Sequence, residues 1–210
     1  PASPSRAAPA VPAPPPVADE HVAIVGMACR FPGVDVDGPD VDGSGLDSFW
    51  NMLEEGRDGV TRVPTDRWDA ERVSSDGDES KRCLHGAFLR DIDAFDADLF
   101  NISPKEAAAM DPQQRLLLQV ARSALEHAGL DAASLHGSET GVFVGMSVTE
   151  YDRVQARETA LEDIGPYYAT GSASSGAAGR IAYVFGFRGP TMTIDTACSS
   201  SLVAMHVARR

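Results

Sequence analysis

Cysteine is scarce in this sequence, and long hydrophobic runs are missing from it. The three cysteines among its 210 residues stand at positions 29, 83 and 198 and form no CxxC pair. This odd number and wide spacing indicate neither a disulfide framework nor a zinc site, and they favour a reducing, cytoplasmic location. No apolar run approaches the ~18 residues that a membrane-spanning helix needs, and the first residues lack the pattern of a signal peptide. We therefore expect no membrane association.

Positive charge is also in short supply. Lysine and arginine together number 18 against 31 acidic residues, which gives a formal net charge of −13. Because such a chain repels phosphate backbones and has no basic stripe, we expect no nucleic-acid partner. Many of the acids fall in two polar stretches, residues 35–42 and 74–79, and these indicate a solvated surface that favours solubility.

Proline is unevenly distributed along the chain. Seven of the 14 prolines lie within residues 1–17, interleaved with alanine and serine. This composition favours an extended chain, so residues 1–20 are predicted to be a flexible Pro/Ala-rich interdomain linker. The chain begins without methionine, and we expect it to be cut from a longer polypeptide or to be a mature fragment. A domain is predicted from His21 to Arg210, opened by the apolar run 22–25 as a buried strand.

Two helices are predicted from hydrophobic spacing in the first part of this domain. Residues 46–55 place their apolar side chains on one face of a short helix that ends at Gly56. Farther on, Asp111 is a suitable cap and Pro112 suits the first position of a helix. A wide apolar stripe follows and continues almost to Gly129. These signals predict a long core helix.

The last seventy residues mix strand and helix signals. Residues 142–144 and 191–195 are short, apolar or β-branched, and typical of strands. Small residues dominate 171–179 and precede an apolar stretch, which predicts a helix whose backbone packs closely against a neighbour. From Ser199 onward almost no polar face remains, so the final helix is predicted to be buried.

Cys198 has the clearest chemical content of any residue in the sequence. It lies between the strand predicted at residues 191–195 and the final helix, in the sequence DTACSSS. A helix amino terminus presents unpaired N–H groups and the positive end of the helix dipole, which favour a thiolate and can hold an oxyanion. A lone cysteine in an apolar segment is more often a small buried hydrophobe. The junction between strand and helix favours a nucleophile instead.

The surrounding sequence decides between these two interpretations. Seven segments in the same order resemble the ketosynthase domains of modular polyketide synthases, which are β-ketoacyl synthases. They are VAIVGMACRFPG (22–33), PTDRWD (64–69), GAFLRDIDAFDADLF (86–100), MDPQQRLLL (110–118), TGVFVG (140–145), AGRIAY (178–183) and GPTMTIDTACSSSL (189–202). One match to DTACSSS would already be a strong signal, and seven ordered matches exclude coincidence.

The resemblance implies an α/β fold of the thiolase type, with αβαβα layers, of which residues 21–210 are the amino-terminal half. It implies that Cys198 is the nucleophile, at the start of a helix buried between the sheets. The cysteine accepts an acyl chain from the phosphopantetheine thioester of an acyl carrier protein. A malonyl-type extender then decarboxylates, and its enolate attacks the Cys198 thioester. Residues 195–197 and 199–201 shape the turn, and the domain binds no cofactor of its own.

The resemblance also implies partners and leaves alternatives open. The expected partners are acyl carrier protein domains, a second copy of the ketosynthase and a neighbouring acyltransferase domain. Cysteine at position 198 favours elongation, because loading-type ketosynthases have glutamine there. Two alternatives remain: a gatekeeper that only transfers the acyl chain, or a non-enzymatic fragment.

The family's two catalytic histidines and its lysine have no match in this sequence. We expect them in the second half of the domain, because the chain stops within the nucleophile helix. The isolated chain should therefore expose an apolar face, be poorly soluble or molten, and form no carbon–carbon bond.

Overall fold

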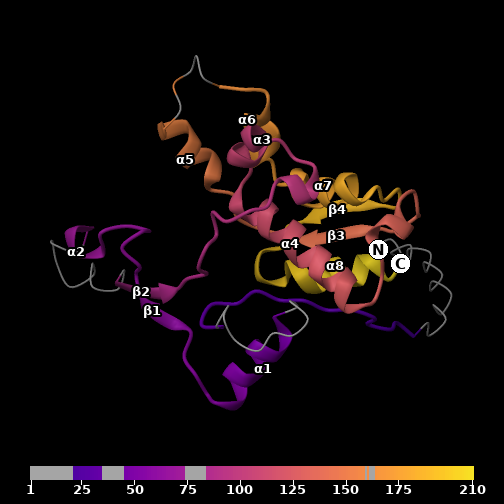
Figure 1. Ribbon diagram of the computed structural model, residues 1–210, viewed down its shortest axis with the longest axis horizontal. Coiled ribbons are helices and arrows are strands. Elements are labelled where there is room, and N and C mark those ends of the chain that lie inside the picture. The colour runs from indigo at the N-terminus through magenta and orange to yellow at the C-terminus, as the bar shows by residue number, and fades with distance from the viewer. Residues whose placement is uncertain (1–20, 35–44, 74–83, 159, 161–163) are drawn as a thin grey trace, which may run out of the picture.

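The computed structural model describes residues 21–34, 45–73, 84–158, 160 and 164–210 (Figure 1). The helices are α1 (Leu46–Glu54), α2 (Ala70–Val73), α3 (Pro104–Ala109), α4 (Pro112–His127), α5 (Tyr151–Glu158), α6 (Tyr167–Ser172), α7 (Ser175–Phe185) and α8 (Ser200–Ala208). The strands are β1 (Val60–Arg62), β2 (His85–Ala87), β3 (Val142–Gly145) and β4 (Thr191–Ile194), and short 3-10 turns are η2 (Asp98–Phe100), η3 (Ala132–Leu135) and η5 (Ala197–Ser199). The predicted linker, residues 1–20, lies outside the described residues.

A parallel strand pair in the carboxyl-terminal part is covered by helices on both faces. β3 and β4 pair in parallel with Gly145 opposite Ile194, so these two residues share a face. The neighbouring Thr193 points to the other face, where its hydroxyl accepts a hydrogen bond from the Ala178 N–H of α7 at 3.4 Å. Gly145 lies against the first turn of α8. The helices α7 and α8 therefore cover opposite faces of the strand pair (Figure 1).

The long helix α4 joins this layered part as the sequence predicts. The Asp111 carboxylate accepts a hydrogen bond from the Gln113 N–H at 2.8 Å, and Pro112 occupies the first turn. α4 packs against α7, and its Leu118 side chain is fully buried in the core. The shared core consists of Phe100, Ile102, Ala107, Met110, Leu118, Val142, Val144, Met146, Ala177, Ala178, Ile181, Ala182 and Phe185.

A buried polar network ties four helices together beside this core. The Gln114 side chain of α4 is 1% exposed, and its amide donates to the carbonyl oxygen of Gly171 in α6 at 3.0 Å. Its amide oxygen accepts from the Arg180 guanidinium of α7 at 3.0 Å, and Arg180 also pairs with Glu106 of α3. A Cβ atom on Gly171 would lie 2.0 Å from the Ala109 carbonyl oxygen. The close packing predicted for these small residues is thus confirmed.

The described residues of the amino-terminal part, 21–34, 45–73 and 84–90, are packed more openly. β1 and β2 form a separate antiparallel pair, and both α1 and this pair lie away from β3 and β4 (Figure 1). The helix predicted over residues 46–55 is confirmed, but its apolar face remains accessible, with Trp50 60% and Leu53 54% exposed. The hydrophobic pattern of residues 46–55 therefore predicts the helix correctly, but no described segment covers its apolar face.

The buried strand predicted at residues 22–25 is wrong for this structure. The segment has no strand pairing among the described residues, and Val22, Ile24 and Val25 are 68–70% exposed. It runs beside the end of α4 instead, where the Met27 N–H donates to the His127 imidazole nitrogen at 3.1 Å. An apolar run forms a buried strand when another strand accepts its backbone hydrogen bonds, and here none of the described strands does.

The prediction of a buried final helix also needs correction. α8 forms as expected and contacts β3 and β4, but only Ser200 and Ala204 are buried. Leu202 and Met205, on its other side, are 72% and 62% exposed. A helix that is apolar all round requires a neighbour on every side, and the described residues supply neighbours on one side. The apolar face that we expected the isolated chain to expose is therefore present. No helix within the described ranges is long and apolar enough to cross a membrane.

Candidate active site

Cys198 lies in the turn that links β4 to α8. β4 ends at Ile194, the 3-10 turn η5 follows, and α8 begins at Ser200 with no interruption. The cysteine is therefore neither inside a long helix nor on a distant loop, and the predicted position at a helix start is confirmed. Its thiol is free and its side chain is exposed.

The turn around Cys198 is held by its polar neighbours. The Asp195 carboxylate accepts a hydrogen bond from the Ala197 N–H at 2.9 Å. The Ser199 hydroxyl donates to the Thr196 carbonyl oxygen at 2.9 Å, and the Ser200 hydroxyl donates to the Ala197 carbonyl oxygen at 2.7 Å. These contacts confirm that the flanking residues shape the turn.

Ser201 is an exception to this expectation. Its hydroxyl has no hydrogen-bond partner within the described ranges, and its side chain is exposed. The residues that shape the turn thus end at Ser200.

Backbone strain marks the residue immediately before Cys198. Ala197 has a φ of 55°, which lies in the left-handed region that residues with a Cβ atom rarely occupy. Such strain persists only where the surroundings hold it, and it clusters at functional sites. Here it lets the chain reverse from β4 into α8 while the Cys198 side chain stays outside the packed layers.

Gly145 at the end of β3 provides the surface on which α8 begins. A Cβ atom at this position would lie 2.6 Å from the Ser201 backbone nitrogen and 2.8 Å from the Ser200 carbonyl carbon. Both are backbone atoms, so neither can rotate away. Because Gly145 has no side chain, the start of α8 can pack directly against the end of β3. This close approach sets the position of Cys198 relative to the strand pair.

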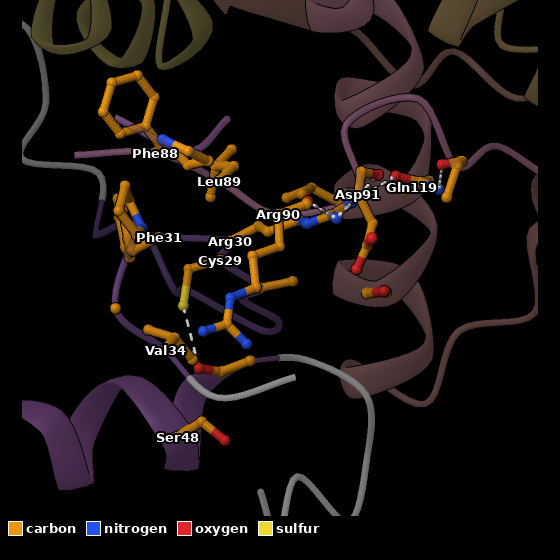
Figure 2. A pocket seen from close by; sticks show the side chains of 18 of the residues that line it. Cys29, Arg30, Phe31, Val34, Ser48, Phe88, Leu89, Arg90, Asp91 and Gln119 are labelled. Atoms are coloured by element: carbon orange, nitrogen blue, oxygen red, sulfur yellow. Dashed lines mark hydrogen bonds between the residues drawn. The ribbon is translucent and has the colours of Figure 1, made fainter. Parts of the chain in front are cut away.

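A cavity in the described part of the chain lies elsewhere, between α1, α4 and the segments around Arg30 and Arg90 (Figure 2). Its volume is about 1040 Å³. Arg30 crosses it, donating to the Gln119 side-chain oxygen at 3.1 Å and to the Arg90 carbonyl oxygen at 2.8 Å. Cys29 lines this cavity and donates to the Gly45 carbonyl oxygen at 3.4 Å. Cys198 does not line it, so the two sites are separate.

No group of histidine, cysteine or acidic residues in the described ranges could hold a metal ion. None of the described histidines forms a hydrogen bond with Cys198. His127 accepts from the Met27 N–H, and His136 packs against Gly186. His206 lies on α8 and is exposed. The site therefore consists of the cysteine, its strained turn and the helix start.

Comparison with known proteins shows which family has this arrangement. A family model described as "Beta-ketoacyl synthase, N-terminal domain" matches residues 19–210. The chain is 50% identical over 192 residues to a phenolphthiocerol/phthiocerol polyketide synthase of Mycobacterium tuberculosis, covering 90% of this chain and 10% of that protein. It is 48% identical over 206 residues to the spectinabilin polyketide synthase system protein NorA' of Streptomyces orinoci, covering 98% and 5%.

Solved structures agree with these relatives. The ketosynthase from module 6 of the bacillaene synthase of Bacillus subtilis, solved as a mutant, has a TM-score of 0.73 and 36% identity, covering 89% of this chain and 29% of that one. An oxazolomycin ketosynthase domain of Streptomyces albus has a TM-score of 0.73 and 40% identity, covering 88% and 31%.

The chain belongs to the β-ketoacyl synthase family. It corresponds to the amino-terminal part of a ketosynthase domain of a modular polyketide synthase, and its fold is thiolase-like. The chain spans about a tenth of the length of the first curated relatives that it matches. Two of the seven ketosynthase-like segments also acquire structural roles. MDPQQRLLL forms the cap and buried face of α4, and TGVFVG forms β3 and ends at the glycine that contacts the start of α8.

The sequence missed two features of this ketosynthase, one at the candidate site and one in the packing of the helices around it. One is the strain at Ala197, which has no sequence signal because alanine gives no hint of positive φ. The other is the polar network around Gln114, for which the sequence offers no more than a glutamine within an apolar helix face. The strain depends on the exact path of the turn, and the polar network depends on contacts between segments that are distant in the sequence.

Proposed function

We propose that this chain supplies the nucleophile of a β-ketoacyl-[acyl-carrier-protein] synthase, and that Cys198 is this nucleophile. The observation that carries the proposal is an exposed thiol on a strained turn at the start of α8, at the end of β4. Family membership supports it, because the relatives are polyketide synthases and ketosynthases. The proposed class is an acyltransferase that forms carbon–carbon bonds.

The first step is acyl transfer to the cysteine. The Cys198 thiolate attacks the thioester carbonyl of an acyl group carried on the phosphopantetheine of an acyl carrier protein. The tetrahedral intermediate collapses with loss of the phosphopantetheine thiolate, which takes up a proton. The Cys198 N–H donates to none of the described residues, so it is available to hold the developing oxyanion at the helix start.

The second step forms the new bond. A malonyl-type extender on a carrier protein loses carbon dioxide, and the resulting enolate attacks the carbonyl of the Cys198 thioester. The carbon–sulfur bond breaks, the β-ketoacyl group leaves on the carrier protein, and the thiolate is regenerated. Covalent catalysis of this type separates loading from condensation and gives ping-pong kinetics. The proposed partners are acyl carrier protein domains, a second ketosynthase copy and a neighbouring acyltransferase domain.

The test is acyl loading by a complete ketosynthase domain that carries this sequence. We expect Cys198→Ala to abolish the acyl-enzyme adduct in intact-protein mass spectrometry. Cys29→Ala is the matched control, because this half-buried thiol donates to the Gly45 carbonyl oxygen and lies in the other region. It should leave loading unchanged.

Two other outcomes would change the assignment. An adduct retained on the Cys198→Ala domain would show that the nucleophile is elsewhere. Loading that depends on Cys198 without release of carbon dioxide or product would identify a transacylating gatekeeper. The present chain on its own should form no carbon–carbon bond, and a soluble, cooperatively melting chain with condensing activity would contradict this expectation.

A further inference from the structure

Ser200 is almost completely buried beside Cys198, and its hydroxyl makes two hydrogen bonds. The side chain is 5% exposed at the start of α8. Its oxygen accepts a hydrogen bond from the Thr196 N–H at 2.9 Å and donates one to the Ala197 carbonyl oxygen at 2.7 Å. One hydroxyl therefore spans the turn that contains Cys198, from the residue two before it to the residue two after it.

The second of these bonds acts on the Cys198 N–H. The Ala197 carbonyl and the Cys198 N–H belong to the same peptide unit, which is planar with the two groups pointing in opposite directions. A hydroxyl that fixes the carbonyl therefore also fixes the direction of the N–H. This N–H is the donor that the proposed function uses for the oxyanion, and it has no partner among the described residues.

The strain at Ala197 explains why such a contact is needed. The φ of 55° is unfavourable for alanine, and rotation to an ordinary value would turn the peptide unit that follows. The Asp195 carboxylate restrains the Ala197 N–H and the Ser200 hydroxyl restrains its carbonyl oxygen. Both ends of the strained residue are thus hydrogen-bonded. At the carbonyl end the Ser200 hydroxyl reinforces the hydrogen bond that the Ser200 backbone N–H donates to the same oxygen.

We propose that Ser200 is a positioning residue, which orients the Cys198 N–H toward the thioester oxygen by holding Ala197 in its left-handed conformation. The inference rests on the proposed function of Cys198. It predicts a difference between two reactions of the same thiol. Transfer from a thioester requires an oriented oxyanion donor, whereas alkylation by iodoacetamide forms no oxyanion.

The experiment compares these two rates in a complete ketosynthase domain that carries this sequence. Ser200→Ala should slow acyl loading by about tenfold, in proportion to the lost hydrogen bonds, and slow alkylation of Cys198 by less than about threefold. Ser201→Ala is the matched control, because it removes an exposed hydroxyl one residue farther along α8 that has no partner within the described ranges. It should leave both rates unchanged.

A second variant keeps the test decisive if Ser200→Ala does not fold. Ala197→Gly removes the steric cost of the left-handed conformation, but glycine adopts φ values of either sign, so the direction of the next peptide unit still depends on the Ser200 hydroxyl. Ala197→Gly and Ala197→Gly/Ser200→Ala therefore form a second pair for the same comparison. Loading that falls no more than alkylation in either pair would overturn the positioning role. Loading retained by Cys198→Ala would instead overturn the proposed function, so the two failures are distinguishable.

Discussion

The two regions of this chain contain similar apolar side chains but bury them to different extents. In residues 95–210, β3, β4 and their helices enclose a continuous core in which Met110, Leu118 and Ala178 are fully buried. In residues 21–90, only Val63 and Ala70 among the described hydrophobic side chains are buried, and the segment from 22 to 25 is exposed. Hydrophobicity alone does not make a core, because burial requires a second surface of matching shape. The turn that holds Cys198 is built on the region that has one.

The largest expected effect tests this difference with one chemical change made in both regions. Leu118→Ala should lower the free energy of unfolding by about 2–5 kcal/mol, because it leaves a cavity in the closed core. Leu53→Ala, at a side chain that is 54% exposed on α1, should cost less than about 1 kcal/mol. Urea unfolding of a complete ketosynthase domain that carries this sequence, followed by circular dichroism, measures both values. Equal losses would show that the amino-terminal region is packed as tightly as the other.

Local signals in the sequence predicted the secondary structure of the packed region well. The cap Asp111, the strand 142–144 and the start of the last helix all depend on residues close to one another in the chain. The position of Cys198 at a helix start was predictable for the same reason.

Contacts between distant segments could not be predicted in this way. The pattern of residues 22–25 suits a buried strand, but no described strand pairs with it. The face of α8 that carries Leu202 is apolar and yet exposed. Sequence periodicity indicates which face of an element is apolar. Whether that face is buried depends on the segments that pack against it.

The second prediction concerns the surface beneath α8. Gly145→Ala should destabilise the complete domain by about 1–3 kcal/mol, because the added methyl group would overlap backbone atoms at the start of α8. It should also slow acyl loading by more than about tenfold, since a displacement of Cys198 misaligns it with its substrate. Thermal unfolding and the loading rate measure the two effects.

The control for this change is Gly179→Ala in the middle of α7. A Cβ atom there would meet nothing within 4 Å, so the substitution adds the same methyl group without a clash. Alanine is also the better helix former by about 1 kcal/mol, and the variant should be as stable as the parent or more stable. If both variants load at the parent's rate, the close approach of α8 to β3 does not position the cysteine.

The smallest change in the free energy of unfolding is expected in a comparison of two glutamines of α4. Gln114 faces the packed region, and Gln119 faces the amino-terminal region. Gln114→Ala leaves the Gly171 carbonyl oxygen and the Arg180 guanidinium without a buried partner and should cost about 1–3 kcal/mol. Gln119→Ala removes contacts to Arg30 and Ala94 at the open cavity, where water can replace them, and should cost less than about 0.5 kcal/mol. The two changes delete the same atoms from α4, so helix propensity cancels when the urea unfolding curves are compared. Gln114 makes four hydrogen bonds and Gln119 makes two, so their number already predicts a larger loss for Gln114→Ala, and burial increases the difference. A larger loss for Gln119→Ala than for Gln114→Ala would place the tighter packing on the amino-terminal side of α4 and reverse the comparison between the two regions.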